Sequence, residues 1–116
     1  MIKVNNNKIT MTRGDSGRLL VTPKVDEEDY TPVSGDTMKF YLKTPRMNAK
    51  ESEYKDPVPL IEKDIPISTM ILNLEPEDTK PFGFGEYVYD IELTFANGLV
   101  DTFINNETFI LAPEVG

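Results

Sequence analysis

The strongest pattern along the chain is an alternation of apolar and polar residues with a period of two. One face of this pattern carries Tyr87, Tyr89, Ile91, Leu93 and Phe95, and the intervening residues are mostly polar. Successive side chains of a strand point to opposite faces, so we predict a half-buried antiparallel strand over 87–95, with both tyrosines in the core. Asn97-Gly98 follows and suits the two positive φ values of a type I′ turn, which predicts a hairpin.

The same alternation predicts further short strands. Met38, Phe40 and Leu42 alternate with Lys39, Tyr41 and Lys43, which is typical of a strand. Proline lacks a backbone donor, so Pro23 favours an edge position or a bulge. We interpret Asn105-Asn106 as a turn. The predicted strands are 8–12, 17–25, 36–44, 60–63, 69–74, 87–95, 99–104 and 108–111.

Three segments do not follow the strand pattern. Residues 75–80 read Glu-Pro-Glu-Asp-Thr-Lys, and an early proline with acids beside the amide end predicts one short helical turn near 76–80. Residues 26–29 are all acidic, so we expect a solvated loop. Residues 45–57 hold many polar residues and few core candidates, which predicts a long exposed loop.

Seven or eight short strands with almost no helical period favour an all-β protein. The expected architecture is an antiparallel β-sandwich of immunoglobulin-like layout. With 116 residues, 39% of them hydrophobic, the chain suits one core, so we expect a single domain over 1–116.

The first residues lack the apolar run of a signal peptide or a membrane helix, which predicts synthesis into the cytoplasm.

The composition excludes most familiar enzyme chemistry. The chain has no His and no Cys, which removes the commonest general base, thiolate nucleophiles and the usual transition-metal ligands. Its 12 basic and 20 acidic residues give a net charge of −8, which opposes binding to nucleic acid and to anionic membranes. We therefore expect a protein that is not an enzyme and uses no cofactor, with protein or glycan partners.

Several short motifs suggest specific chemistry, but each has a simpler structural explanation. Arg13-Gly14-Asp15 is the tripeptide that integrins recognise on exposed loops, yet a turn between strands explains it. The acids at 26–29 and between 75 and 78 lack the alternating spacing of a calcium loop. Asn106-Glu107-Thr108 is a glycosylation sequon, which matters only on a secretory route.

Four segments of the chain are recognisable together and in order. They are TRGDSGRLLVTP, SGDTMKFYLK, LEPEDTKPFGFGEYVYDIELTFANGLVDTF and TFILAPEVG. These segments resemble a family of small β-sandwich proteins from tailed bacteriophages and prophages of Gram-positive bacteria. The most specific part is PEDT followed by GEYVYDIEL, the NG turn and a terminal segment from Phe109 to Val115. Similar domains are modules of tails, baseplates and head fibres, so the resemblance implies a structural or attachment role without catalytic residues.

From this resemblance we expect a non-enzymatic virion module, made in the bacterial cytoplasm, that contacts other virion proteins or further copies of itself. Unpaired groups at a sheet edge can add a strand from a partner. The candidate interface is the apolar end segment Phe109, Ile110 and Leu111, with strand 8–12. The alternative is a receptor- or carbohydrate-binding module, in which Tyr41 and Tyr54, with the 45–57 loop, bind a cell-surface glycan or protein.

Overall fold

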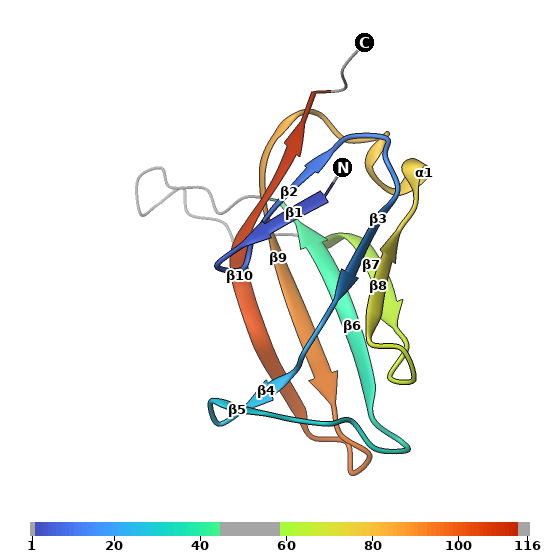
Figure 1. Cartoon of the computed structure of the whole chain (residues 1–116), viewed down its shortest axis with the longest axis vertical. Coiled ribbons are helices and arrows are strands. Elements are labelled where there is room, and N and C mark those ends of the chain that lie inside the picture. Colours follow the sequence, from blue (N-terminus) through green and yellow to red (C-terminus); the bar gives the residue numbers. More distant parts are fainter. Residues whose placement is uncertain (1, 45–58, 114–116) are drawn as a thin grey trace.

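The computed structural model describes residues 2–44 and 59–113, and strands dominate the described part (Figure 1). The one described helix has four residues, so the protein is mostly β, as expected. Ten strands are described, where the sequence predicts seven or eight. In chain order the elements are β1 (Ile2–Asn5), β2 (Lys8–Thr12), β3 (Gly17–Leu20), β4 (Lys24–Val25), β5 (Glu28–Asp29), β6 (Thr37–Lys43), β7 (Pro59–Ile65), β8 (Ile71–Leu74), α1 (Pro76–Thr79), β9 (Gly85–Thr94) and β10 (Val100–Ala112).

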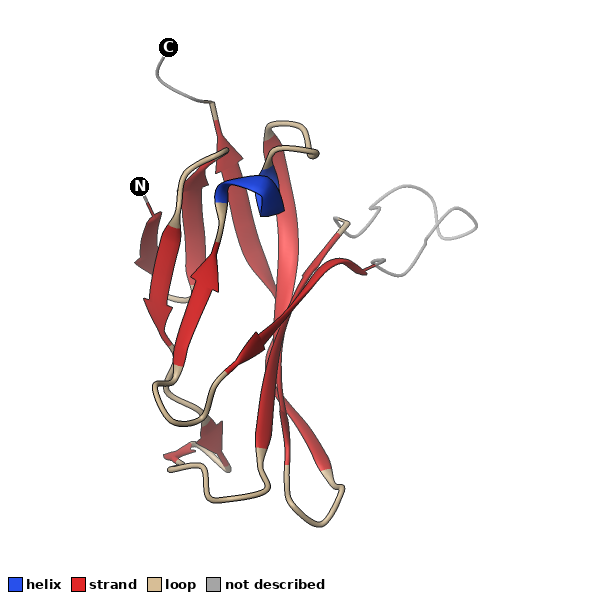
Figure 2. Ribbon diagram, turned by 90° about the vertical axis from the view of Figure 1, so that its right-hand side faces the viewer, coloured by secondary structure: helices blue, strands red, loops and turns tan. Residues whose placement is uncertain are grey.

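The strands form one large sheet and two small ones. The large sheet has six strands in the order β1-β2-β10-β9-β6-β7. Its neighbouring strands are antiparallel except for β2 and β10, which are parallel and pair Ile9 with Phe109. The antiparallel pair β3–β8 lies over one face of the large sheet (Figure 2), and β4–β5 is a separate short hairpin.

The core fills the space between the large sheet and β3–β8. Three aromatic side chains lie at its centre, because the ring centroid of Phe40 is 5.7 Å from that of Tyr89 and 6.0 Å from that of Phe109. Tyr89 is 2% exposed, which confirms its predicted place, whereas Tyr87 is half-buried. The buried hydrophobic residues are Ile9, Met11, Val21, Met38, Phe40, Leu42, Ile65, Leu72, Leu74, Tyr89, Ile91, Leu93, Phe109 and Leu111.

The predicted helical turn is confirmed and is tied to the opposite layer. The Asp78 carboxylate accepts a hydrogen bond from the backbone N–H of Glu75 at 2.8 Å. An acid at this position also suits the positive end of the helix. The buried Thr79 hydroxyl accepts a hydrogen bond from the backbone N–H of Gly14 at 2.8 Å, so α1 holds the turn that follows β2.

Two predicted turns near the end of the chain have a different form. At the first, Gly98 has φ +91° but Asn97 does not have a positive φ, and the N–H of Gly98 donates to the carbonyl of Phe95 at 2.8 Å. This is the three-residue hairpin loop with a glycine in the left-handed region, not the type I′ turn. The Asn105-Asn106 turn is absent: β10 continues through both residues, and a register shift marks a bulge there.

The N-terminal region also departs from the prediction. Predicted strand 17–25 is interrupted at residues 21–23, and the carbonyl of Pro23 accepts a hydrogen bond from Tyr30. The acidic segment 26–29 is not a simple loop, because Asp26 and Glu27 have positive φ values and form the turn of the β4–β5 hairpin. β1 was not predicted, since its residues show no clear apolar alternation.

Candidate functional site

The predicted interface segment at Phe109, Ile110 and Leu111 does not lie at a sheet edge. Phe109 is 0% exposed and Leu111 is 1% exposed, and this part of β10 pairs with β2 on one side and with β9 on the other. Ile110 is half-buried. The edge prediction is therefore wrong for β10, and also for β2, because β1 covers its outer side. The outer strands of the large sheet are β1 and β7.

The aromatic pair of the alternative prediction is only half described. Tyr41 is half-buried in the middle of β6, and Tyr54 lies outside the described residues, as does the predicted loop 45–57. Burial, and then the charges of Glu92 and Glu62, raise the pKa of Tyr41 above its ordinary value. The structure thus places Tyr41 among carboxylates of the neighbouring strands.

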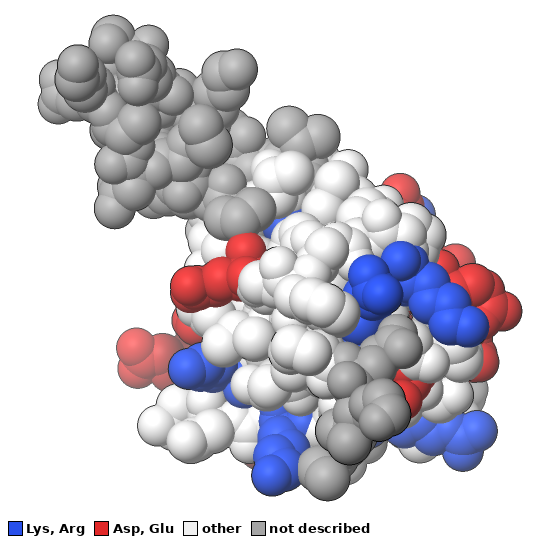
Figure 3. Space-filling model, turned by 90° about the horizontal axis from the view of Figure 1, so that it is seen from above, with Lys and Arg blue, Asp and Glu red and all other residues white. Residues whose placement is uncertain are grey.

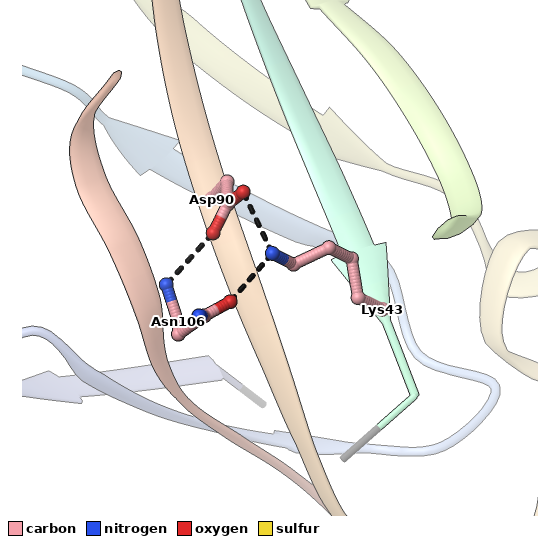
Figure 4. A network of polar contacts seen from close by, with 3 residues as sticks. All are labelled: Lys43, Asp90 and Asn106. Carbon is pink, nitrogen blue, oxygen red and sulfur yellow. Dashed lines mark hydrogen bonds and ion pairs between the residues drawn. The ribbon is translucent and has the colours of Figure 1, made fainter. Parts of the chain in front are cut away.

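A polar network at the end of β6 explains why β10 does not turn at Asn106. The Lys43 ammonium donates to the Asp90 carboxylate at 2.7 Å and to the Asn106 side-chain oxygen at 2.5 Å. The backbone N–H of Asn106 donates to the other Asp90 oxygen at 2.7 Å, and Figure 4 shows the three residues closing a ring of contacts. Lys43 is only 9% exposed. The network therefore joins β6, β9 and the bulge of β10 in a partly buried site.

The first exposed apolar surface lies at the end of the protein that is lowest in Figure 1, where the β9–β10 hairpin turns and the chain enters β6. Val33, Leu99 and Val100 are 57%, 66% and 57% exposed. We call these three residues the apolar tip. The two loops that bear them lie side by side, because the N–H groups of Val33 and Ala96 both donate to the Asp36 carboxylate. Exposed apolar side chains brought together in this way mark a candidate contact surface.

A buried carboxylate holds the two loops of the apolar tip together. Asp36 is 4% exposed and accepts hydrogen bonds from the Tyr30 hydroxyl at 2.6 Å, from the Val33 N–H at 2.9 Å and from the Ala96 N–H at 3.0 Å. The Tyr30 bond, followed by the Val33 amide, lowers the pKa of Asp36 below its ordinary value. Because these donors come from both loops, the tip is a fixed surface.

Close packing adds to this order. The rings of Tyr30 and Phe95 meet edge to face, with centroids 5.5 Å apart. Gly35 has φ +98°, and a Cβ there would lie 2.8 Å from the Cβ of Ala96. This position therefore needs glycine for its backbone conformation and for its lack of a side chain.

The second exposed apolar surface is a cleft of about 120 Å³ between the two layers. It arises because, among the described residues, β2 covers β10 along Phe109–Ala112 and leaves the first half of β10 open on that side. The rim residues Val4 and Leu20 are 50% and 70% exposed. We call this surface the side cleft. Its lining residues are Val4, Asn7, Ile9, Leu19, Leu20, Val21, Thr22, Tyr89, Ile91, Phe103 and Ile104.

Tyr89 is one of the polar residues that line the side cleft. Its hydroxyl donates a hydrogen bond to the backbone carbonyl of Asn7, in the turn between β1 and β2. Burial, and then the charge of Glu107, raise the pKa of Tyr89 to about 12. The hydroxyl therefore stays protonated at neutral pH and fixes the β1–β2 hairpin against the core.

The integrin-type tripeptide Arg13-Gly14-Asp15 forms a turn that contacts the segment around α1 and Phe82. Gly14 has φ +83°, and the Arg13 guanidinium donates to the carbonyl of Phe82 at 3.3 Å and lies 4.6 Å from the centre of the Phe84 ring. These contacts support the interpretation as a turn. Seen from this end of the protein, basic and acidic side chains are both visible (Figure 3).

Residues 2–44 and 59–113 contain no group of three His, Cys, Asp or Glu side chains placed to hold a metal ion. Nor do they contain a helix with the length and apolar character needed to cross a membrane.

Comparison of the chain with protein-family models, with curated proteins and with solved structures finds no match. The class that the described structure supports is a mostly-β domain with two exposed apolar surfaces. Sequence reasoning missed both surfaces. For the tip, the available signal was the apolar pair Leu99-Val100 directly after a hairpin turn, where polar residues are usual. The side cleft had no sequence signal, because it depends on where β2 stops covering β10.

Proposed function

We propose that the chain is a non-enzymatic structural module of a phage or prophage virion, which holds other virion proteins through its exposed apolar surfaces. The sequence resemblance supports the virion setting, and the exposed surfaces support the contact role. The module would be made in the bacterial cytoplasm and incorporated into the tail, the baseplate or a head fibre.

Three features support an immunoglobulin-like layout within this proposal. The strand order places β10, β9, β6 and β7 side by side, with β3–β8 on the facing layer. One helical turn, α1, precedes β9. The Tyr87 hydroxyl near the start of β9 donates to the carbonyl of Gly83, four residues upstream, at 2.8 Å. A tyrosine that binds the backbone just upstream is typical of immunoglobulin-like sandwiches.

The observation that carries the contact role is the order of the apolar tip. Its three side chains are more than half exposed, yet the loops that bear them are fixed by the hydrogen bonds of Asp36. A surface that is already ordered loses little conformational entropy when a partner binds. Exposed apolar side chains on an ordered surface are therefore favourable for binding a protein partner.

Analysis of purified particles tests this proposal. Phage particles induced from the bacterium that encodes the chain are purified and examined by mass spectrometry, and particles from a deletion strain are examined by electron microscopy. We expect the chain in the particles and a missing or unstable appendage after deletion. Complementation with Leu99→Asp should fail, whereas Phe84→Asp, at an apolar residue 52% exposed and outside the tip, should succeed. Absence of the chain from purified particles would refute the proposal.

A further inference from the structure

We propose that the partner of the apolar tip is a second copy of this chain, and that the tip of one copy docks in the side cleft of the next. This inference rests on the proposed function, because it names one partner of the same surfaces. Shape and charge support it.

The shapes match at the scale of single side chains. The side cleft measures about 120 Å³, and an apolar cavity of roughly 150 Å³ takes up a molecule as large as benzene. Leu99 is the most exposed residue of the tip at 66% and lies at the turn of the β9–β10 hairpin. A leucine or valine side chain at a hairpin turn is small enough to enter such a cleft.

The N-terminal strands that border the side cleft and the segments that lead to the tip differ in charge. β1, β2 and β3, which border the side cleft, carry Lys3, Lys8 and Arg18 and no acidic residue. Residues 26–29, in the hairpin that leads to the tip, are all acidic, and Asp101 follows Val100. Opposite potentials on two surfaces guide their encounter and select their relative orientation.

Three charged residues reduce this contrast. Asp101 and Glu107 belong to β10, which also supplies Phe103 and Ile104 to the side cleft, and Lys24 pairs with Asp29 at 3.8 Å. Even so, residues 1–25 contain five basic residues and one acidic residue, a net charge of +4. The rest of the chain contains seven basic and 19 acidic residues, a net charge of −12.

The proposed contact joins two different surfaces, so it is heterologous. Each copy then offers one tip and one cleft, and the contact can extend into a ring or a row of copies. Three tip residues and one small cleft bury less surface than a typical stable interface of about 1,200–2,000 Å². We therefore expect weak association, visible at high protein concentration and reinforced when copies are held together in a particle.

Mixing two disabled variants tests the contact directly. Leu99→Asp disables the tip and Leu20→Asp disables the cleft, and both residues are at least 66% exposed, so both variants should fold. We measure the mass in solution by sedimentation velocity over a concentration series. The wild-type chain should associate and each variant alone should be a monomer. Their equimolar mixture should form dimers but no larger species, because one intact tip and one intact cleft remain. Phe84→Asp serves as the control and should associate like the wild type.

A wild-type monomer at every concentration, variants that associate normally, or a mixture that stays monomeric would each overturn the inference. If the chain is nevertheless found in purified particles, the proposed function stands and its partner is another protein. If the chain associates but is absent from particles, the docking inference stands and the proposed function fails.

Discussion

Replacing Lys43 by methionine tests whether the partly buried polar network stabilises the bulge of β10. Methionine keeps most of the aliphatic length of lysine but removes the charged donor. The change removes the 2.7 Å bond to Asp90 and the 2.5 Å bond to Asn106. Asp90 keeps only the backbone N–H of Asn106 as a donor within this network, so its charge is left largely uncompensated in a site with little solvent.

The size of the effect follows from burial. A hydrogen bond to a charged group contributes about 1.5–3 kcal/mol, and removing one member of a fully buried ion pair costs about 3–5 kcal/mol. The side chains of Lys43 and Asp90 are 11% and 18% exposed, so water partly compensates for the loss. We expect Lys43→Met to lower the free energy of unfolding by about 2–3 kcal/mol and the melting temperature by about 8–12 °C.

The same strand supplies a matched control. Lys39 pairs with Glu62 at the same distance of 2.7 Å, but these side chains are 40% and 54% exposed. Exposed pairs contribute little to stability, so Lys39→Met should cost much less than Lys43→Met. Urea unfolding followed by circular dichroism at pH 7 measures both variants. Equal losses in the two variants, or a loss below about 0.5 kcal/mol for Lys43→Met, would refute the reasoning.

Three further predictions concern pH and charge. The lowered pKa of Asp36 stabilises the fold above the ordinary pKa of an aspartate, and this stability is lost as pH falls through the lowered value; Asp36→Asn should flatten the acid limb of a stability–pH curve. Tyr89 affects stability in the opposite direction of pH, because its pKa is raised from 10.0 to about 12. The unfolded chain loses this proton first as the pH rises, so stability should fall between pH 10 and 12. Tyr89→Phe should reduce that fall in alkaline unfolding curves. Arg18→Glu should weaken self-association in sedimentation velocity if charge guides the tip to the cleft, and an unchanged association would contradict that role.

The sequence predicts local elements well and long-range pairing poorly. The alternation around Ile91 and the helix-start pattern at Pro76 each identify an element, because neighbouring residues determine them. The prediction of a turn at Asn106 is wrong, because the groups that bind this residue, Lys43 and Asp90, come from other strands. The prediction that Phe109 lies at an edge failed for the same reason: its parallel partner, Ile9, is at the other end of the chain.

The candidate site was likewise predictable only in the parts that neighbouring residues determine. The exposed residues of the apolar tip stand beside recognisable turn residues, and Asp36 directly follows Gly35 in a typical turn sequence. Its role as the acceptor for both loops depends on Ala96, which the sequence places far away. Burial of a carboxylate that satisfies three donors is a property of the folded chain.

The parallel pairing of β2 with β10 determines the order in which the molecule can be completed during synthesis. β10, the last of the described strands, supplies Phe109 and Leu111 to the core and fills the place between β2 and β9. Until β10 leaves the ribosome, the N-terminal hairpin β1–β2 lacks its neighbour in the large sheet. Pairings between distant parts of a chain slow folding because they close long loops. The side cleft, whose walls include β10, therefore forms only after β10 has been made, which delays any docking between copies until each chain is complete through β10.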